Sequence, residues 1–268
     1  MDSRTGKKIR MGRLFNQQSG KAIVVAYSHG LLMGPRPGML TLDEMRRTAH
    51  ALREADGLLI APGMVRYLED AFVGKDRPSL FIHMDYESFD RPALPYAEGA
   101  TVDLATIEEV VATGADGILT YLFIGYADPE REKMEIARNA RLARACERWG
   151  VLLMIEPRSA RQAQHPQDDR DPAVMSTYCR IAAEIGADLV KCIHPGATEA
   201  LRSIVTTCPA PLLVAGGARE GDAREAAYAK ARSALEAGAA GLVFGRHIYE
   251  APDPPAEMAR FRQIVHGQ

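Results

Sequence analysis

Eight short apolar runs, separated by longer amphipathic stretches, constrain the fold of this 268-residue chain more than any other feature. Each run spans four to eight residues, is rich in Val, Ile and Leu, and shows no polar alternation. Such runs are typical of strands that are buried on both faces of a parallel sheet. We therefore predict strands at residues 22–27, 57–60, 80–84, 117–124, 151–155, 189–192, 211–215 and 241–244.

The stretches between these runs carry the signals of helix ends. Thr41 and Glu44 have the spacing of a capping box, and Asp171-Pro172 supplies an N-cap followed by a first-turn proline. Asp103 is expected to begin a further helix that closes at Gly114. The chain therefore alternates between predicted strands and predicted helices.

A weak internal repeat supports a single architecture built from one unit. Short junctions of glycine, alanine and acidic residues precede four of the apolar runs, at residues 54–57, 114–117, 186–188 and 238–241. Glycine can take the left-handed conformation that ends a helix and leads into the next strand. Eight repeated strand–helix units predict an α/β fold, the (β/α)8 TIM barrel, as a single domain over residues 1–268. A doubly wound sheet is disfavoured because no GxGxxG motif follows the first strand.

Composition excludes several classes of function. Thirty-three basic and thirty-five acidic residues give a net charge of −2, which offers no basis for binding nucleic acid or a membrane surface. No apolar run approaches the roughly 20 residues of a membrane span, and the basic N-terminus is followed by no apolar signal region. Residues 1–20 are expected to form a leader segment that is solvated or packs in an oligomer. Four cysteines without CxxC spacing indicate a reduced, cytoplasmic protein without a zinc site.

Catalytic residues of such barrels lie at the C-terminal ends of the strands. Lys191 is the one lysine of seven that falls inside an apolar strand, within the run 187–193. Burial lowers the pKa of a lysine and makes its neutral amine accessible, and that amine can attack a carbonyl group to form a Schiff base. The alternative is a lysine paired with a carboxylate inside the barrel and without catalytic function.

The ends of the last two strands indicate a phosphate site. Gly216 and Gly217 follow the seventh strand, and Gly245 and Arg246 follow the eighth. Glycines let backbone N–H groups approach an anion, and a guanidinium group adds bidentate hydrogen bonding. Loops at these two positions often bind phosphate in this fold, although the glycines could also be simple turns.

Taken together, these segments resemble the archaeal-type class I fructose-bisphosphate aldolases within the DeoC/LacD aldolase family, with the aminodideoxy-heptulosonate synthases and the autoinducer-2 thiolases as relatives. The resemblance extends over residues 22–266 and rests on residues 26–30 (Ala-Tyr-Ser-His-Gly), 157–158, 182–191, 208–217 and 237–246. It implies that Lys191 is the Schiff-base lysine and that Gly216, Gly217, Gly245 and Arg246 hold phosphate. It also implies no metal or organic cofactor, and a homo-oligomer, often a decamer of two stacked pentamers.

The chain departs from the family at two positions of the site. Ser28 stands where the family usually has an aspartate, and Glu156 stands where the aldolases tend to have a proton-shuttling tyrosine. We expect Glu156 to serve as the acid/base, or else only to hold Lys191 or Arg158 by ion pairing. Ser28, His29 and Arg158 are expected to contact substrate. The segment containing residues 164–169 is expected to form an altered loop over the site.

Other polar residues rank below these as candidates for substrate contact. His83, Asp85, Tyr121 and His194 lie at or near predicted strand ends, where a lone histidine is more often a satisfied structural residue. No Ser-His-Asp order and no cluster of metal ligands is evident in the sequence, so no metal site is predicted.

The sequence and the resemblance together predict a cytoplasmic, Schiff-base-forming aldolase, a lyase that cleaves or forms a C–C bond in a phosphorylated keto substrate. One alternative is a lysine-dependent thiolase or transferase of the kind that processes autoinducer-2. The other is a catalytically silent barrel that binds sugar phosphates. Trapping with borohydride and product analysis with coenzyme A would distinguish the three.

Overall fold

A computed structural model describes residues 2–87, 100–218 and 224–267 of the chain. Within these ranges eight parallel strands close into a barrel, in which the first strand pairs with both the second and the last. The strands are β1 (Ala22–Ala26), β2 (Gly57–Ile60), β3 (Ser79–His83), β6 (Gly117–Ile124), β7 (Leu152–Ser159), β8 (Leu189–Ile193), β9 (Leu212–Ala215) and β10 (Gly241–Phe244). The predicted (β/α)8 barrel is confirmed.

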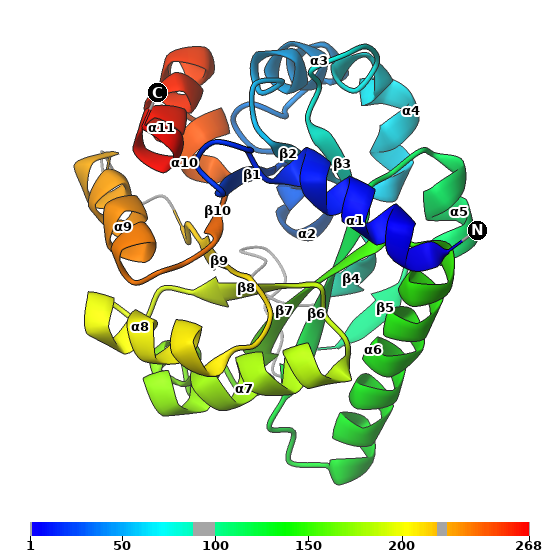
Figure 1. The fold of residues 1–268 in the computed structure, drawn as a ribbon, viewed down its shortest axis with the longest axis vertical. Helices are drawn as coiled ribbons and strands as arrows, with labels where there is room; N and C mark the ends of the chain where they lie inside the picture. Colours follow the sequence, from blue (N-terminus) through cyan, green and yellow to red (C-terminus); the bar gives the residue numbers. More distant parts are fainter. Residues whose placement is uncertain (1, 88–99, 219–223, 268) are drawn as a thin grey trace.

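Helices surround the barrel and connect its strands (Figure 1). The outer helices are α3 (Leu42–Ala51), α4 (Val65–Leu68), α5 (Ile107–Ala112), α6 (Pro129–Trp149), α7 (Pro172–Ile185), α8 (Thr198–Thr207), α9 (Arg224–Glu236) and α11 (Pro254–His266). Short helices α2 (His29–Met33) and α10 (Arg246–Tyr249) follow β1 and β10, and 3₁₀ turns lie at η1 (Pro62–Met64), η2 (Glu69–Ala71) and η3 (Asp168–Arg170). None of the helices in the described ranges is long and apolar enough to cross a bilayer.

The strands separate two buried clusters because successive side chains of a strand point to opposite faces. Ile23 and Val25 of β1 belong to the cluster between strands and helices, whereas Val24 belongs to the cluster inside the barrel. The same alternation in β8 places Leu189 inside the barrel and Val190 outside it. The alternation of side chains along each strand therefore determines which of them reach the barrel interior.

The junction repeat has a second structural role besides ending helices. Gly114, the first residue of one such junction, has the expected left-handed conformation, with φ of 79°. The aspartates at the same junctions accept hydrogen bonds from the N–H groups of the second residues of neighbouring strands, as in Asp56 with Ile23 at 2.6 Å and Asp188 with Leu153 at 2.8 Å. These carboxylates thus satisfy strand ends that would otherwise be unpaired.

Most of the leader predicted over residues 1–20 is a helix docked on the barrel, and packing of this segment in an oligomer stays a prediction. Residues Ser3–Leu14 form helix α1, which lies across one end of the barrel (Figure 1). Its basic side chains pair with junction aspartates: Lys7 Nζ lies 2.9 Å from Asp188, and Arg13 lies 3.1 Å from Asp116. Those aspartates explain why a basic helix docks here.

Leu14→Ala is expected to lower the free energy of unfolding by roughly 2–5 kcal/mol, the usual cost of truncating a fully buried leucine. Leu14 is completely buried in the cluster inside the barrel, so its removal leaves a cavity. Ile9→Ala is the control, because Ile9 is 52% exposed on the same helix and its loss should cost within about 0.5 kcal/mol. Urea denaturation of both variants measures the difference. Equal free energies of unfolding for the two variants would show that the packing of Leu14 inside the barrel contributes little to stability.

The prediction that Asp103 begins a helix is wrong. Asp103 ends strand β5 (Thr101–Asp103), which pairs antiparallel with β4 (Asp85–Glu87) in a hairpin that the sequence analysis did not predict. Helix α5 begins later, because Thr106 and Glu109 form a complete capping box. The side chain of Asp103 instead pairs with Arg138 of α6 at 2.7 Å.

Candidate active site

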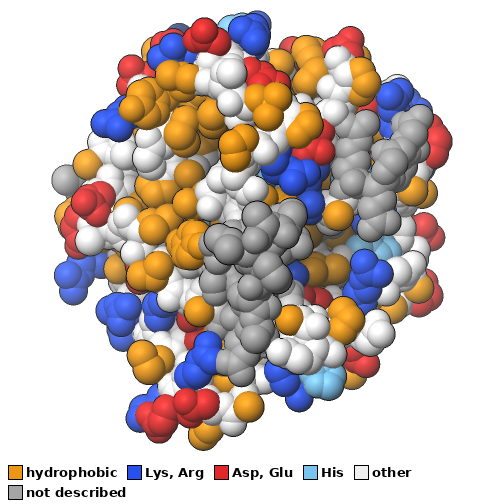
Figure 2. Space-filling model, turned by 180° about the vertical axis from the view of Figure 1, so that it is seen from behind, with side chains coloured by type: hydrophobic (Ala, Val, Ile, Leu, Met, Phe, Trp, Pro, Cys, Tyr) orange, Lys and Arg blue, Asp and Glu red, His pale blue; other side chains and the backbone are white. Residues whose placement is uncertain are grey.

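A pocket of about 640 Å³ opens at the C-terminal end of the barrel, within the size range of small-molecule sites. Its lining comes from the ends of six strands and from the segment between β7 and α7. Figure 2, turned by 180° from Figure 1, shows acidic and basic side chains interspersed around the edge of the molecule. The segment with Gln162, Ala163, Pro166 and Asp169 contributes to the wall, as expected for the altered loop.

Lys191 lies in this pocket because of its position in β8. It follows Leu189 by two residues, so its side chain points into the barrel, above the layer that Leu189 fills. Lys191 is only 8% exposed. A cationic side chain at this depth requires a partner, since burying an unpaired charge is costly.

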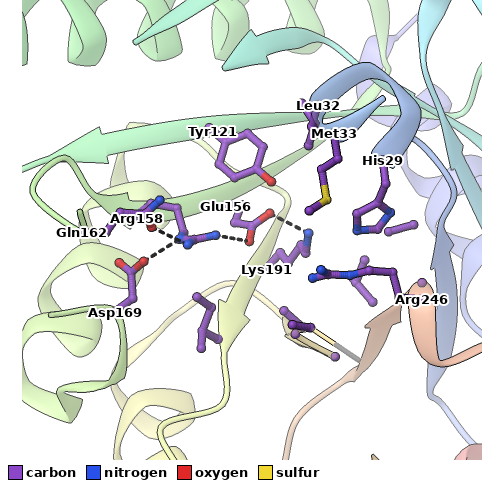
Figure 3. A pocket seen from close by; sticks show the side chains of 18 of the residues that line it. His29, Leu32, Met33, Tyr121, Glu156, Arg158, Gln162, Asp169, Lys191 and Arg246 are labelled. Carbon is purple, nitrogen blue, oxygen red and sulfur yellow. Dashed lines mark hydrogen bonds and ion pairs between the residues drawn. The ribbon is translucent and has the colours of Figure 1, made fainter. Parts of the chain in front are cut away.

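Glu156 is that partner. It stands on β7, next to β8, and its Oε2 lies 2.6 Å from Lys191 Nζ (Figure 3). Glu156 was expected just after the fifth barrel strand, but β7 continues to Ser159, so both Glu156 and Arg158 lie within the strand. Burial acts to raise the pKa of Glu156, but the positive charges of Lys191 and Arg158 together lower it below its ordinary value. Near pH 7 Glu156 is therefore an ionised carboxylate, and it is not the protonated acid that burial alone would produce.

Glu156 is expected to make the folded protein less stable in acid. Its pKa is lower than 4.5, the ordinary value, so its ionised form contributes stability above pH 4.5 that is lost as the pH falls further. In urea titrations the difference in unfolding free energy between wild type and Glu156→Gln should be larger at about pH 7 than at about pH 3. Glu184→Gln removes an exposed pair with Arg180 and should change stability little at either pH. A difference that is independent of pH would contradict this account.

Arg158 holds the wall of the pocket together. Its Nε lies 2.6 Å from Asp169 Oδ2, its guanidinium group donates to Gln162 Oε1, and Nη1 lies 3.5 Å from Glu156 Oε1 (Figure 3). Arg158 lines the pocket, and its predicted contact with substrate stays a prediction. Its side chain also connects the segment after β7 to Glu156.

His29 and Arg246 face the pocket from the opposite side. Among the described residues, His29 Nδ1 and Arg246 Nε are buried atoms without a hydrogen-bond partner. Burial, together with the positive charges of Arg246 and Lys191, lowers the pKa of His29 well below 6.5. His29 is thus neutral near pH 7 and can donate or accept a hydrogen bond. Both side chains suit a polar, anionic substrate.

The predicted phosphate glycines lie together at the pocket, but they differ in what they can offer. The N–H of Gly216 donates to the carbonyl oxygen of Val243 at 3.2 Å, so it is already engaged. Gly217 has φ of +80°, which favours glycine. Lys230 of α9 donates to the carbonyl oxygen of Gly216 at 2.8 Å and fixes this turn, a contact that the sequence analysis missed.

Tyr121 lines the pocket beside Glu156, although the sequence analysis ranked it low. Figure 3 shows its hydroxyl group pointing toward Glu156 and Lys191. The signal that could have identified it is its spacing of two residues from Leu119, which also points into the barrel. His194 lies instead against α9, with Nε2 2.9 Å from Ser233 Oγ, and does not line this pocket.

Ser28 does not line the pocket. It is 5% exposed, and its Oγ lies 2.8 Å from Nδ1 of His83. His83 in turn faces Asp85 and Glu87, so the structure assembles a serine, a histidine and two carboxylates that the sequence analysis did not group. Burial acts to lower the pKa of His83, but these two carboxylates raise it to about 9. This cluster is the side-chain group among the described residues that could hold a metal ion.

Comparisons with known proteins agree with this architecture. The family profile of the DeoC/LacD aldolases matches residues 22–251. A 2-amino-4,5-dihydroxy-6-oxo-7-(phosphonooxy)heptanoate synthase of Streptomyces griseus is 30% identical over 264 residues, covering 97% of this chain and 90% of its own. A 3-hydroxy-5-phosphonooxypentane-2,4-dione thiolase of Yersinia pestis is 28% identical over 263 residues, with coverage of 97% and 82%.

Among solved structures, an archaeal fructose 1,6-bisphosphate aldolase superposes with a TM-score of 0.80 at 23% identity. The match covers 98% of this chain and 100% of that chain, so the whole barrel is shared. The family profile covers most of the sequence, and the likeness extends through every strand of the barrel. The chain therefore belongs to the DeoC/LacD aldolase family.

Proposed function

We propose that the protein is a class I aldolase that forms a Schiff base between Lys191 and a phosphorylated ketone. The observation that carries this proposal is the buried ion pair of Lys191 and Glu156 in a pocket that Arg246 and glycine turns also line. A Schiff-base lysine needs a group that removes its proton and later returns it, and Glu156 is in contact with the amine.

Proton transfer between the two residues supplies the acid and the base in turn. Glu156 takes a proton from Lys191, and the neutral amine attacks the ketone carbon to give a carbinolamine. That adduct carries no charge, so burial then favours the protonated form of Glu156. The proton passes to the carbinolamine hydroxyl group, water leaves, and a positively charged iminium ion forms beside the restored carboxylate.

The iminium ion then accepts the electrons of C–C cleavage. Glu156 removes the proton from the hydroxyl group on the β-carbon, the Cα–Cβ bond breaks, and an aldehyde leaves. The remaining enamine is neutral and takes the proton from Glu156 at Cα, and hydrolysis of the resulting iminium ion releases the ketone. Addition runs through the same steps in reverse.

Phosphate binding orients the ketone in this proposal. The guanidinium group of Arg246 and backbone N–H groups of Gly217 and Gly245 supply the donors, whereas the N–H of Gly216 is already engaged and Gly216 contributes to the turn. A Cβ on Gly216 would lie 2.9 Å from the ring of Phe244. The phosphorylated compound named for the Streptomyces synthase supports this substrate class.

Deuterium exchange tests the proposal without knowledge of the aldehyde partner. Dihydroxyacetone phosphate in D₂O should incorporate deuterium at the carbon next to its carbonyl group in the presence of the enzyme, because the enamine forms reversibly. Lys191→Met should reduce incorporation to the uncatalysed rate. Lack of exchange with wild type, for this phosphate and for other small keto phosphates, would overturn the proposal.

A lysine-dependent thiolase is the second candidate, favoured by the 28% identity to the Yersinia enzyme. Product analysis with and without coenzyme A distinguishes the two: an acyl thioester formed only with coenzyme A indicates transfer, and an aldehyde formed without it indicates an aldolase. A silent sugar-phosphate-binding barrel would bind the ketone phosphate and show neither product nor exchange.

Gly245→Ala is expected to raise KM for a phosphorylated ketone by on the order of 10–10²-fold. A Cβ at this position would lie 2.4 Å from the carbonyl oxygen of Ala26 and 2.8 Å from Cε1 of His29, so the turn must shift away from the phosphate. Gly63→Ala, after β2 at the same end of the barrel, is the control because nothing lies within 4 Å of its Cβ position. Steady-state kinetics compares the two, and equal KM values would remove Gly245 from the phosphate site.

A further inference from the structure

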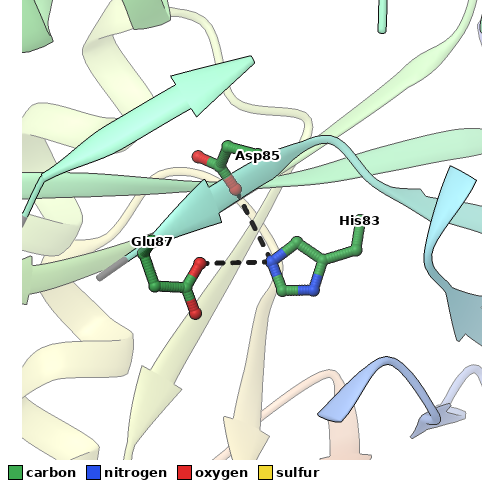
Figure 4. Close-up of side chains that lie close together, drawn as sticks. All are labelled: His83, Asp85 and Glu87. Carbon is green, nitrogen blue, oxygen red and sulfur yellow. Dashed lines mark ion pairs between the residues drawn. The ribbon is translucent and has the colours of Figure 1, made fainter. Parts of the chain in front are cut away.

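Three buried side chains converge beside the Schiff-base pocket (Figure 4). His83, Asp85 and Glu87 follow one another at intervals of two residues along β3 and β4, which places them on one face of the extended chain. Nε2 of His83 lies 3.4 Å from Glu87 Oε2 and 3.6 Å from Asp85 Oδ1. The exposed side-chain fractions are 2% for His83 and zero for both acids.

The atoms that face one another lack hydrogen bonds. In the described part of the chain, His83 Nε2, Asp85 Oδ1 and both carboxylate oxygens of Glu87 are buried without a hydrogen-bond partner. Arg138 reaches only the other oxygen of Asp85, at 3.0 Å, and also pairs with Glu135 and Asp103. Two buried carboxylates beside one imidazole are costly unless a cation neutralises them.

The surroundings orient these groups as they would around a metal ion. Nδ1 of His83 can donate to Ser28 Oγ at 2.8 Å, which leaves the lone pair of Nε2 directed at the carboxylates. Asp85 Oδ2 accepts hydrogen bonds from Thr120 Oγ1 at 2.7 Å and from the N–H of Tyr121 at 2.9 Å. Such contacts behind the ligands fix the histidine tautomer and the carboxylate orientation in metal sites.

We propose that His83, Asp85 and Glu87 bind a divalent first-row transition-metal ion through Nε2, Oδ1 and a carboxylate oxygen. The distances of 3.4 Å and 3.6 Å from His83 Nε2 to the two carboxylate oxygens match tetrahedral coordination, because ligand atoms with bonds of about 2.0–2.2 Å to one ion lie roughly 3.3–3.6 Å apart. One nitrogen and two oxygen ligands suit Zn²⁺, Mn²⁺ or Fe²⁺, and a fourth position remains for water.

The ion is not expected to take part in Schiff-base formation. None of its three ligands lines the pocket that holds Lys191. It would instead hold Ser28 next to His29 and support Tyr121, whose ring centroid lies 5.7 Å from that of His83. The metal site and the aldolase proposal can therefore succeed or fail independently.

A proton is the competing occupant. Protonated His83 between the two carboxylates would neutralise part of their charge without any metal. A metal ion and a proton compete for the same Nε2 lone pair, so binding should weaken as the pH is lowered. Direct titration with metal ions separates these occupants.

The test uses tag-free, chelator-treated protein titrated by calorimetry with MnCl₂, ZnCl₂ and CoCl₂. Wild type should bind one ion per chain of at least one of these metals. Binding should raise the melting temperature of the protein, and bound Co²⁺ should give visible absorption bands. Glu87→Gln should weaken that binding by at least about 10²-fold while borohydride trapping at Lys191 is retained. Glu257→Gln, which alters a buried carboxylate on α11, is the control and should bind as wild type does.

Two outcomes overturn the metal site. One is the lack of stoichiometric binding by wild type with all three metals, which leaves the proton as occupant. The other is Glu87→Gln binding as tightly as wild type, which places any bound metal elsewhere. If Glu87→Gln does not fold, as judged by circular dichroism, His83→Gln takes its place with the same expected loss.

Discussion

Lys191→Met should lower turnover of a phosphorylated keto substrate by on the order of 10⁴–10⁶-fold, because Lys191 is the one lysine among the described residues that line the pocket. Methionine has a similar length and is accepted in buried positions, so the barrel should still fold. Lys191 is 8% exposed on β8, and its only described ion-pair contact is Glu156. The expected loss therefore reflects chemistry, with little change in architecture.

Lys21→Met is the matched control for this variant. Lys21 lies just before β1, at the end of the barrel opposite the pocket, and donates to the carbonyl oxygen of Ala239. Its loss should therefore leave turnover within a few-fold. Steady-state rates and circular dichroism are measured on the same preparations. Turnover by Lys191→Met above about one per cent of wild type would contradict the assigned role.

Glu156→Gln should lower turnover by on the order of 10²–10⁴-fold, the usual contribution of a positioned acid/base. The amide has nearly the same shape as the carboxylate but cannot accept the proton of Lys191 or return it to the carbinolamine. Substrate affinity should stay within a few-fold, because Arg246 and the glycine turns follow β9 and β10, whereas Glu156 is on β7.

Asp169→Asn separates a chemical role of Glu156 from a structural one. Asp169 pairs with Arg158 at 2.6 Å and so supports the same wall, but it has no described ion pair with Lys191. We expect this variant to lose stability while turnover per folded molecule stays within about 10-fold. If Glu156→Gln behaves in the same way, with reduced stability and near-normal turnover, Glu156 is a structural partner only.

The barrel was predictable because its strands are buried on both faces and therefore read as uninterrupted apolar runs. Helix α1 was not, because its contacts are mainly charged: Lys7 and Arg13 reach aspartates that lie more than a hundred residues away in the sequence. A basic stretch that docks on distant carboxylates has the same composition as one that is solvated.

The candidate site was predictable for those residues whose position along a barrel strand determines where the side chain points. Lys191 and Glu156 both lie on barrel strands, and period two directs both into the barrel. The cluster of His83, Asp85 and Glu87 was missed because the apolar run ends at Met84, after which the polar alternation looked like a loop. The pairing of β4 with β5 makes that segment extended, and this pairing depends on residues 101–103.

Borohydride reduction followed by peptide mass spectrometry tests the central claim most directly. Wild-type protein incubated with dihydroxyacetone phosphate and sodium borohydride should gain the mass of the reduced ketone on the peptide that contains Lys191, and on no peptide of Lys191→Met. A label at another lysine, or labelling of Lys191→Met to the same extent as wild type, would contradict the proposed Schiff base.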